Sequence, residues 1–161
     1  MEAKTLVVFA LLMFLSRIIE RTPFFPLWYL LSTFWHELSH YVVGVALGGK
    51  PTLPTLFPRK VGGVWVLGQV TLRNPNPFVL LPCGLAPLSL VFFAYLLVLH
   101  LPPSLLRDVA LFFLLHGSSP SLQDLKTAFS SIPGILFWGA VAVFFFFLLK
   151  VSTLSPPSPL L

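Results

Sequence analysis

Long apolar runs, broken by proline, glycine and a few charged residues, make up most of this 161-residue chain. Such runs predict helices, and those of about 20 residues are long enough to cross a membrane. Only 9% of the residues are charged, whereas about 25% are charged in a typical soluble domain. So few charges cannot cover the whole surface of a protein in water. We therefore expect an all-α polytopic membrane protein with about four or five membrane helices.

The breaks between the runs set the predicted helix boundaries. The runs cover residues 5–19, 26–47, 78–101, 105–116 and 134–149, with a short polar helix expected between the last two. Gly48 and Gly49 end the second run, and Pro102 follows the third, as expected of residues that terminate helices. We treat residues 1–150 as a single membrane-embedded domain and residues 151–161, rich in proline and serine, as a disordered tail.

An insert of different character, residues 48–78, separates the second and third runs. It contains VWVLGQVTL, in which β-branched and aromatic residues are interrupted by glycine, and this pattern predicts a small β-hairpin. Its basic residues are Lys50, Arg59, Lys60 and Arg73. Because basic residues are enriched in cytoplasmic loops, we expect the insert to face the cytoplasm. The expected location is a multi-pass protein of the cell (inner) membrane, with its active site toward the cytoplasm.

The motif HELSH, residues 36–40, lies within the second apolar run. An α-helix turns about 100° per residue, so His36 and His40 project from one face, one turn apart. This spacing allows two imidazoles to bind one tetrahedral zinc ion. Glu37 is then placed to act as a general base toward a water molecule on the open side of the metal. The pattern H-E-x-x-H is the signature of zinc peptidases.

A polar seam is the alternative interpretation of the same residues. A short motif also arises by chance, and the two histidines would then hydrogen-bond to neighbouring helices while Glu37 pairs with an arginine. The apolar context favours the metal site, because an ionisable group inside a membrane span costs several kcal/mol unless it has a partner.

A catalytic zinc site needs a third protein ligand and leaves its fourth position open. The downstream candidates are His100, Asp108, His116 and Asp124. Asp124 is favoured because it follows the break HGSSPS, and irregular backbone at membrane depth usually lines a cavity. SLQD, residues 121–124, also matches a capping box, which would give Asp124 a structural role. His116 is the reserve ligand, and Asp108 is expected to form a solvated loop pair with its neighbour Arg107.

With these residues the chain resembles the site-2 protease-type intramembrane zinc metalloproteases, as a short, divergent member. The resemblance rests on HELSHYVVGVALGG, on the β-like insert, on GLAPLSL in the next run and on a late aspartate, and it covers roughly residues 26–130. It implies that His36, His40 and Asp124 bind zinc and that Glu37 activates water. The family's Leu-Asp-Gly at the third ligand reads LQDLK here, while PSLQD fits the Pro-Ser-x-x-Asp arrangement of short members.

The resemblance implies a zinc-dependent endopeptidase that hydrolyses peptide bonds in or near transmembrane segments. The expected partners are a transmembrane protein substrate and membrane lipid, and no basic cluster suggests a nucleic acid. Residues 65–72 could offer a strand edge to an unwound substrate, or form a plain hairpin at the membrane surface. A non-catalytic scaffold or chaperone and a small transporter are competing functions. Glu37 argues against the scaffold, and the lack of an internal repeat argues against the transporter.

Overall fold

The computed structural model describes residues 3–154 and is mostly helical with one small antiparallel hairpin, as the sequence predicts. The helices are α1 (Ala3–Ile19), α2 (Phe25–Trp28), α3 (Leu30–Ala46), α4 (Pro77–Gly84), the 3-10 helix η1 (Ala86–Leu88), α5 (Ser89–His100), α6 (Leu105–Gly117), α7 (Leu122–Ala128) and α8 (Ile132–Leu154). The strands are β1 (Arg59–Val61) and β2 (Val64–Val66), paired so that Lys60 lies opposite Trp65.

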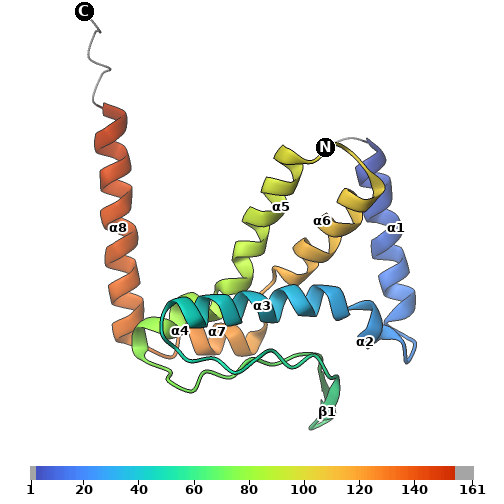
Figure 1. The fold of residues 1–161 in the computed structure, drawn as a ribbon, viewed down its shortest axis with the longest axis horizontal. Helices are drawn as coiled ribbons and strands as arrows, with labels where there is room; N and C mark the ends of the chain where they lie inside the picture. Colours follow the sequence, from blue (N-terminus) through green and yellow to red (C-terminus); the bar gives the residue numbers. More distant parts are fainter. Residues whose placement is uncertain (1–2, 155–161) are drawn as a thin grey trace, which may run out of the picture.

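Helix α3 lies across the molecule, and α1, α5, α6 and α8 extend from it to one side (Figure 1). Helices α1, α5 and α6 form one group, whereas α8 stands apart from that group and reaches farther. The hairpin lies on the opposite side of α3. Helix α8 is attached near its beginning, where Trp138 Nε1 donates a hydrogen bond to the carbonyl oxygen of Phe78 at 2.7 Å. Helix α8 is therefore connected to the group of α1, α5 and α6 through the segments around α3.

The prediction of one unbroken helix over residues 26–47 is wrong, because the chain turns at Tyr29, between α2 and α3. The side chains at this turn bind back to α1 and the residues that follow it. Trp28 Nε1 donates to Ser16 Oγ at 2.9 Å, and the Tyr29 hydroxyl donates to Glu20 Oε1 at 2.7 Å. These contacts between distant segments decide where the run divides.

The third predicted run is also divided, with a 42° bend between α4 and the η1–α5 segment. Pro87, in η1, has no backbone N–H, so the carbonyl oxygen of Cys83 lacks its regular helical donor four residues on. The bend therefore leaves a buried acceptor that another part of the molecule must satisfy.

The group formed by α1, α5 and α6 has a small apolar core and one buried polar cluster. Its buried apolar side chains include Leu90, Ala94, Leu111 and Leu114. The expectation of a solvated loop pair at residues 107 and 108 is wrong, because both side chains are buried in the first turns of α6. Their guanidinium and carboxylate lie 3.1 Å apart, and Thr5 of α1 donates to the carboxylate at 3.2 Å. This polar cluster connects the beginnings of α1 and α6.

Among the described helices, one is long and apolar enough to cross a membrane by itself, namely the part of α8 from Ile132 to Lys150. The bent α4–α5 segment would be a second if it counts as one span. Helices α1, α5 and α6 have 17, 12 and 13 residues, fewer than the roughly 20 that a full span needs. The expected four or five spans are thus not confirmed. Helix α8 includes the first four residues of the predicted tail, and the remaining ones, 155–161, lie outside the described residues.

Candidate metal centre

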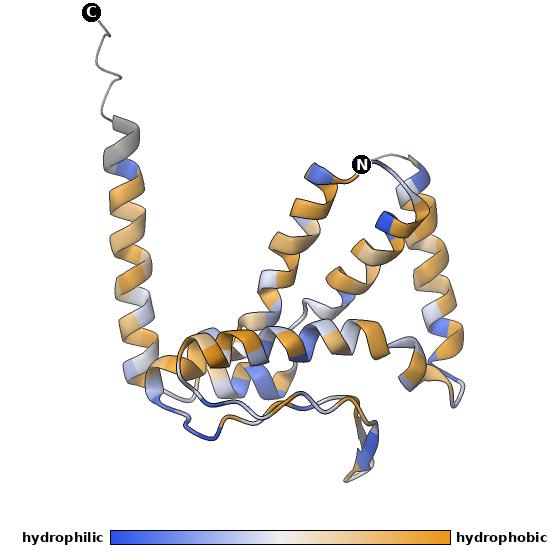
Figure 2. Cartoon of the chain, viewed as in Figure 1, coloured by the Kyte–Doolittle hydropathy of each residue, from blue (hydrophilic) through white to orange (hydrophobic). Residues whose placement is uncertain are grey.

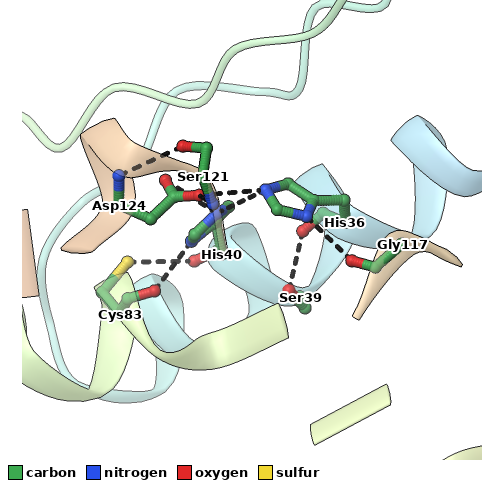
Figure 3. Close-up of polar contacts among 7 residues, drawn as sticks. All are labelled: His36, Ser39, His40, Cys83, Gly117, Ser121 and Asp124. Carbon is green, nitrogen blue, oxygen red and sulfur yellow. Dashed lines mark hydrogen bonds and ion pairs between the residues drawn. The ribbon is translucent and has the colours of Figure 1, made fainter. Parts of the chain in front are cut away.

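The two motif histidines project from the same face of α3 and turn their Nε2 atoms toward each other (Figure 3). The two Nε2 atoms are 3.2 Å apart. His40 is buried and His36 is half-buried. The spacing of four residues therefore places both imidazoles on one face of α3, as the sequence predicts.

Each imidazole is oriented by a backbone carbonyl that a helix break has left without its helical donor. His36 Nδ1 lies 2.8 Å from the carbonyl oxygen of Gly117, the last residue of α6. His40 Nδ1 lies 2.7 Å from the carbonyl oxygen of Cys83, which Pro87 leaves without its regular partner. Because a carbonyl oxygen only accepts hydrogen bonds, each Nδ1 carries the proton and donates it. Both Nε2 atoms are then free to act as ligands.

Asp124 brings a carboxylate from α7 to the same point. Its Oδ2 atom is 3.2 Å from His36 Nε2, and its Oδ1 atom is 3.2 Å from His40 Nε2. The capping box is also present, since Ser121 Oγ accepts from the Asp124 N–H at 3.1 Å and Asp124 Oδ2 accepts from the Ser121 N–H at 2.7 Å. The two roles considered for Asp124 are therefore compatible, because the cap fixes the carboxylate in the orientation that faces the histidines.

Close packing of α4 on α7 sets the position of Asp124 relative to α3. A Cβ atom on Gly84, the last residue of α4, would lie 2.5 Å from the carbonyl oxygen of Asp124. Only glycine allows the two backbones to approach so closely. Since α4 also supplies the carbonyl that orients His40, one helix positions two of the three groups.

The three groups fit a divalent metal ion. One ligand atom each from His36, His40 and Asp124 lie within 4.8 Å of one another. With both Nδ1 atoms donating to carbonyls, the two Nε2 atoms and the Asp124 carboxylate converge on one point. A proton on an imidazole satisfies such a group, as does a cation at its centre, and the set of two imidazoles and one carboxylate is typical of catalytic zinc.

The Asp124 carboxyl is ionised at neutral pH. Burial by itself raises its pKa, but hydrogen bonds from His36, His40 and Ser121 outweigh burial and hold the pKa below its usual range. The carboxylate is the form that binds a metal ion, so the site does not have to lose this proton before it binds the metal.

Glu37 is buried and is held by the insert rather than by the other motif residues. It is 8% exposed, and the backbone of Val70 donates a hydrogen bond to its carboxylate. A Cβ atom on Gly68 would lie 2.7 Å from Glu37 Cγ and 2.7 Å from Thr33 Cγ2. The chain around residue 68 therefore packs directly on the glutamate, which is possible because residue 68 is glycine.

We call residues 66–72 the strap. The strap lies along a cavity of about 1320 Å³ that also contains His36, Glu37, His40 and Asp124. The predicted strand at residues 65–72 is a regular strand only as far as Val66. Beyond it, two isolated bridges join the strap to the first half of the insert, between Thr55 and Gln69 and between Pro51 and Leu72. One edge of the strap is therefore paired, and its other parts line the cavity.

We call His36, His40 and Asp124 the metal group, because they could hold an ion. The remaining candidate ligands do not belong to it. His116 lines the same cavity, where its ring stacks on Tyr29 with centroids 4.6 Å apart. His100 Nδ1 binds the carbonyl oxygen of Leu96 in its own helix, and Asp108 belongs to the polar cluster with Thr5. Sequence reasoning did not find the roles of Gly68, or of the carbonyls that orient the histidines. The sequence does contain helix-breaking residues after these carbonyls, and these residues could have indicated that the carbonyls lack their helical donors.

Removal of the Ser121 hydroxyl tests the link between the cap and the metal group. Replacement of an N-cap serine by alanine costs about 1 kcal/mol, so Ser121→Ala should loosen the beginning of α7 and weaken zinc binding by about fivefold. The measurement is competition with a chromophoric chelator. Ser104→Ala is the matched control, because Ser104 caps α6 in the same way and lies outside the cavity lining. Equal affinities in the two variants would show that the cap does not support the metal group.

Two imidazoles and a carboxylate surround one point, and a second carboxylate lies beside them in a large cavity. This arrangement can support metal-assisted hydrolysis. The cavity is large enough for several residues of an extended peptide. No family model, curated protein or solved structure matches this chain.

Proposed function

We propose that this chain is a zinc-dependent intramembrane endopeptidase of the site-2 protease type, which hydrolyses peptide bonds in or near the transmembrane segments of other proteins. His36, His40 and Asp124 hold the zinc ion, and Glu37 is the general base. One observation carries the proposal: three potential ligand atoms from α3 and α7 lie within 4.8 Å of one another, next to a buried glutamate and inside a cavity.

The proposal includes a polytopic membrane location. Figure 2 shows that α1, α5 and α8 consist mostly of hydrophobic residues, and many of their large apolar side chains are exposed. Only 6% of the apolar segment of α8 is buried inside the protein. Such surfaces are stable in lipid and not in water. The bias of basic residues toward the insert supports an orientation with the strap and the metal group toward the cytoplasm of the cell (inner) membrane.

In the proposed reaction the protein's own groups position the reactants and move one proton. Zinc, when bound, lowers the pKa of a water molecule and polarises the scissile carbonyl. Glu37 accepts a proton from the attacking water and then donates it to the leaving amine, so that a peptide bond and a water molecule become a carboxyl and an amine. The Val70 N–H holds the Glu37 carboxylate, and the carbonyls of Gly117 and Cys83 hold the imidazoles.

The geometry of the strap supports an extended substrate. A helical segment must unwind before its carbonyls become accessible, since they are hydrogen-bonded within the helix. The strap lines the cavity from Val66 to Leu72. Its Gln69 and Thr71 backbone groups pair with the first half of the insert, so an unwound segment would pair with backbone groups on the other edge.

Measurement of zinc and of cleavage tests the proposal. The protein purified in detergent should contain about one zinc ion per chain, as the three-ligand site requires, and should cleave a single-span reporter protein. A strong chelator should abolish cleavage, and added zinc should restore it. Lack of zinc in a folded preparation would refute the metal site.

The same preparation distinguishes the enzyme from a non-catalytic scaffold that retains this fold. Zinc at one ion per chain with no cleavage of any of a broad set of single-span reporters would favour the scaffold. The buried glutamate beside the metal group favours the enzyme, because a structural zinc site has no use for a general base.

A further inference from the structure

One end of the cavity has a chemical character that the proposed hydrolysis does not use. Glu20, Tyr29 and His116 line it. The Tyr29 hydroxyl donates to Glu20 Oε1 at 2.7 Å, and the Tyr29 ring stacks on His116 at an interplanar angle of 24°. Phe25 and Trp65 line the same cavity and form an edge-to-face pair with ring centroids 5.3 Å apart. The Glu20 carboxylate thus accepts from a tyrosine whose ring stacks on a histidine, in a cavity that also contains an aromatic pair.

We propose that this group of residues, which we call the Glu20 subsite, binds a lysine or arginine side chain of the peptide substrate. A carboxylate favours a cation through a charge-assisted hydrogen bond, and aromatic side chains in the same cavity add cation–π attraction. This inference rests on the proposed peptidase function and specifies which substrates it selects.

The other charged groups of the cavity leave Glu20 as the carboxylate open to a substrate cation. Asp124 faces the two histidines, and Glu37 is held by the strap. Arg17 lies 3.6 Å from Glu20, but its side chain is 77% exposed. A surface ion pair of this kind contributes little free energy and is readily exchanged for a substrate cation. Arg59 also lines the cavity, where it donates to the side-chain oxygen of Gln69.

The length of α3 sets the distance between the subsite and the metal group. Tyr29 immediately precedes α3, and His36 is seven residues farther along. At a rise of about 1.5 Å per residue, the two positions are roughly 10 Å apart along the helix axis. An extended peptide covers about 3.3 Å per residue, so the selected side chain would lie about three residues from the scissile bond.

This position agrees with the composition of membrane proteins. Lysine and arginine are concentrated at the cytoplasmic ends of transmembrane segments. A substrate that unwinds near such an end would place a basic flanking residue about three residues from the exposed peptide bond. The preferred substrates are then single-span proteins with lysine or arginine beside the span, on the side of the insert.

Reporter proteins that differ in one residue test the subsite. A set of three single-span reporters carries lysine, leucine or glutamate three residues before the mapped cleavage site. A second set carries the same three residues at the corresponding position after it. The wild type should cleave the lysine reporter about tenfold faster than the leucine reporter, with the glutamate reporter slowest. Glu20→Gln should remove most of this preference while the Tyr29 hydroxyl keeps its acceptor. Glu20→Lys should reverse the order of the lysine and glutamate reporters.

A binding measurement separates recognition from catalysis. In the Glu37→Gln background, fluorescent peptides with the lysine and leucine sequences should bind with the same tenfold difference, and Glu20→Gln should again remove it. Wild-type cleavage of the three reporters at equal rates on both sides of the bond would overturn the subsite and leave the peptidase intact. No cleavage of any reporter by the zinc-loaded wild type would instead refute the peptidase.

Discussion

Glu37→Gln is expected to lower the cleavage rate of a single-span reporter by about 10²- to 10⁴-fold, the usual contribution of a general base. Glutamine has nearly the same size as glutamate and still accepts a hydrogen bond from Val70, so the variant should fold with its zinc content unchanged. The measurements are single-turnover cleavage and zinc content of the same preparation. Loss of activity at full zinc occupancy identifies a proton-transfer role rather than a structural one.

Asp124→Ala is the informative companion to that variant. It removes the proposed third ligand, so both zinc and cleavage are expected to be lost together. Full zinc occupancy in Asp124→Ala would move the third ligand elsewhere, and His116 would be the first residue to examine because it lines the same cavity. Wild-type cleavage by Glu37→Gln would exclude the glutamate as the base and would contradict the proposed mechanism.

Gly68→Ala is expected to lower cleavage by about 10- to 100-fold, because a displacement of about 1 Å at a catalytic group costs up to 10²-fold in rate. The added Cβ would lie 2.7 Å from Glu37 Cγ and 2.9 Å from Glu37 Oε1, so that the strap or the glutamate must move. Gly68 is not one of the glycines with positive φ, so the effect comes from contact with Glu37 and not from backbone strain. Zinc content should stay near that of the wild type.

Two further variants make this test specific. Gly139→Ala is the matched control, since a Cβ atom there meets nothing within 4 Å. Thr33→Ser removes the Cγ2 atom that would lie 2.7 Å from a Cβ atom at residue 68, so it should restore part of the activity to Gly68→Ala. If Gly68→Ala keeps wild-type activity, the strap does not position Glu37. If Thr33→Ser fails to raise the activity of the double variant, the contact with Thr33 does not contribute to the loss.

Much of the helical organisation follows from local signals. The predicted runs at residues 5–19, 105–116 and 134–149 correspond to α1, α6 and α8, because continuous apolar sequence that ends at proline, glycine or charge has few alternatives to a helix. The capping box at Ser121 was likewise predictable, since it joins residues three apart. The divisions at Tyr29 and between α4 and α5 were missed. The first depends on side-chain contacts with α1, which no local pattern contains.

The geometry of the metal group likewise depends partly on local sequence and partly on packing between distant segments. The i, i+4 spacing of His36 and His40 already places the two imidazoles on one helix face, since helix geometry alone determines it. That Asp124, rather than His116 or Asp108, completes the group depends on how α4 and α7 pack against α3. This packing requires a glycine at residue 84, and the Cys83 carbonyl that Pro87 leaves without its helical donor orients His40.

The sequence by itself determined that the chain is helical, apolar and marked by one H-E-x-x-H motif, because these properties depend on composition and on spacings shorter than five residues. Only the tertiary structure decided which carboxylate faces the imidazoles, which backbone covers Glu37 and which residues surround Glu20. Those groups are brought together by contacts between segments tens of residues apart, and such contacts form only when the helices pack.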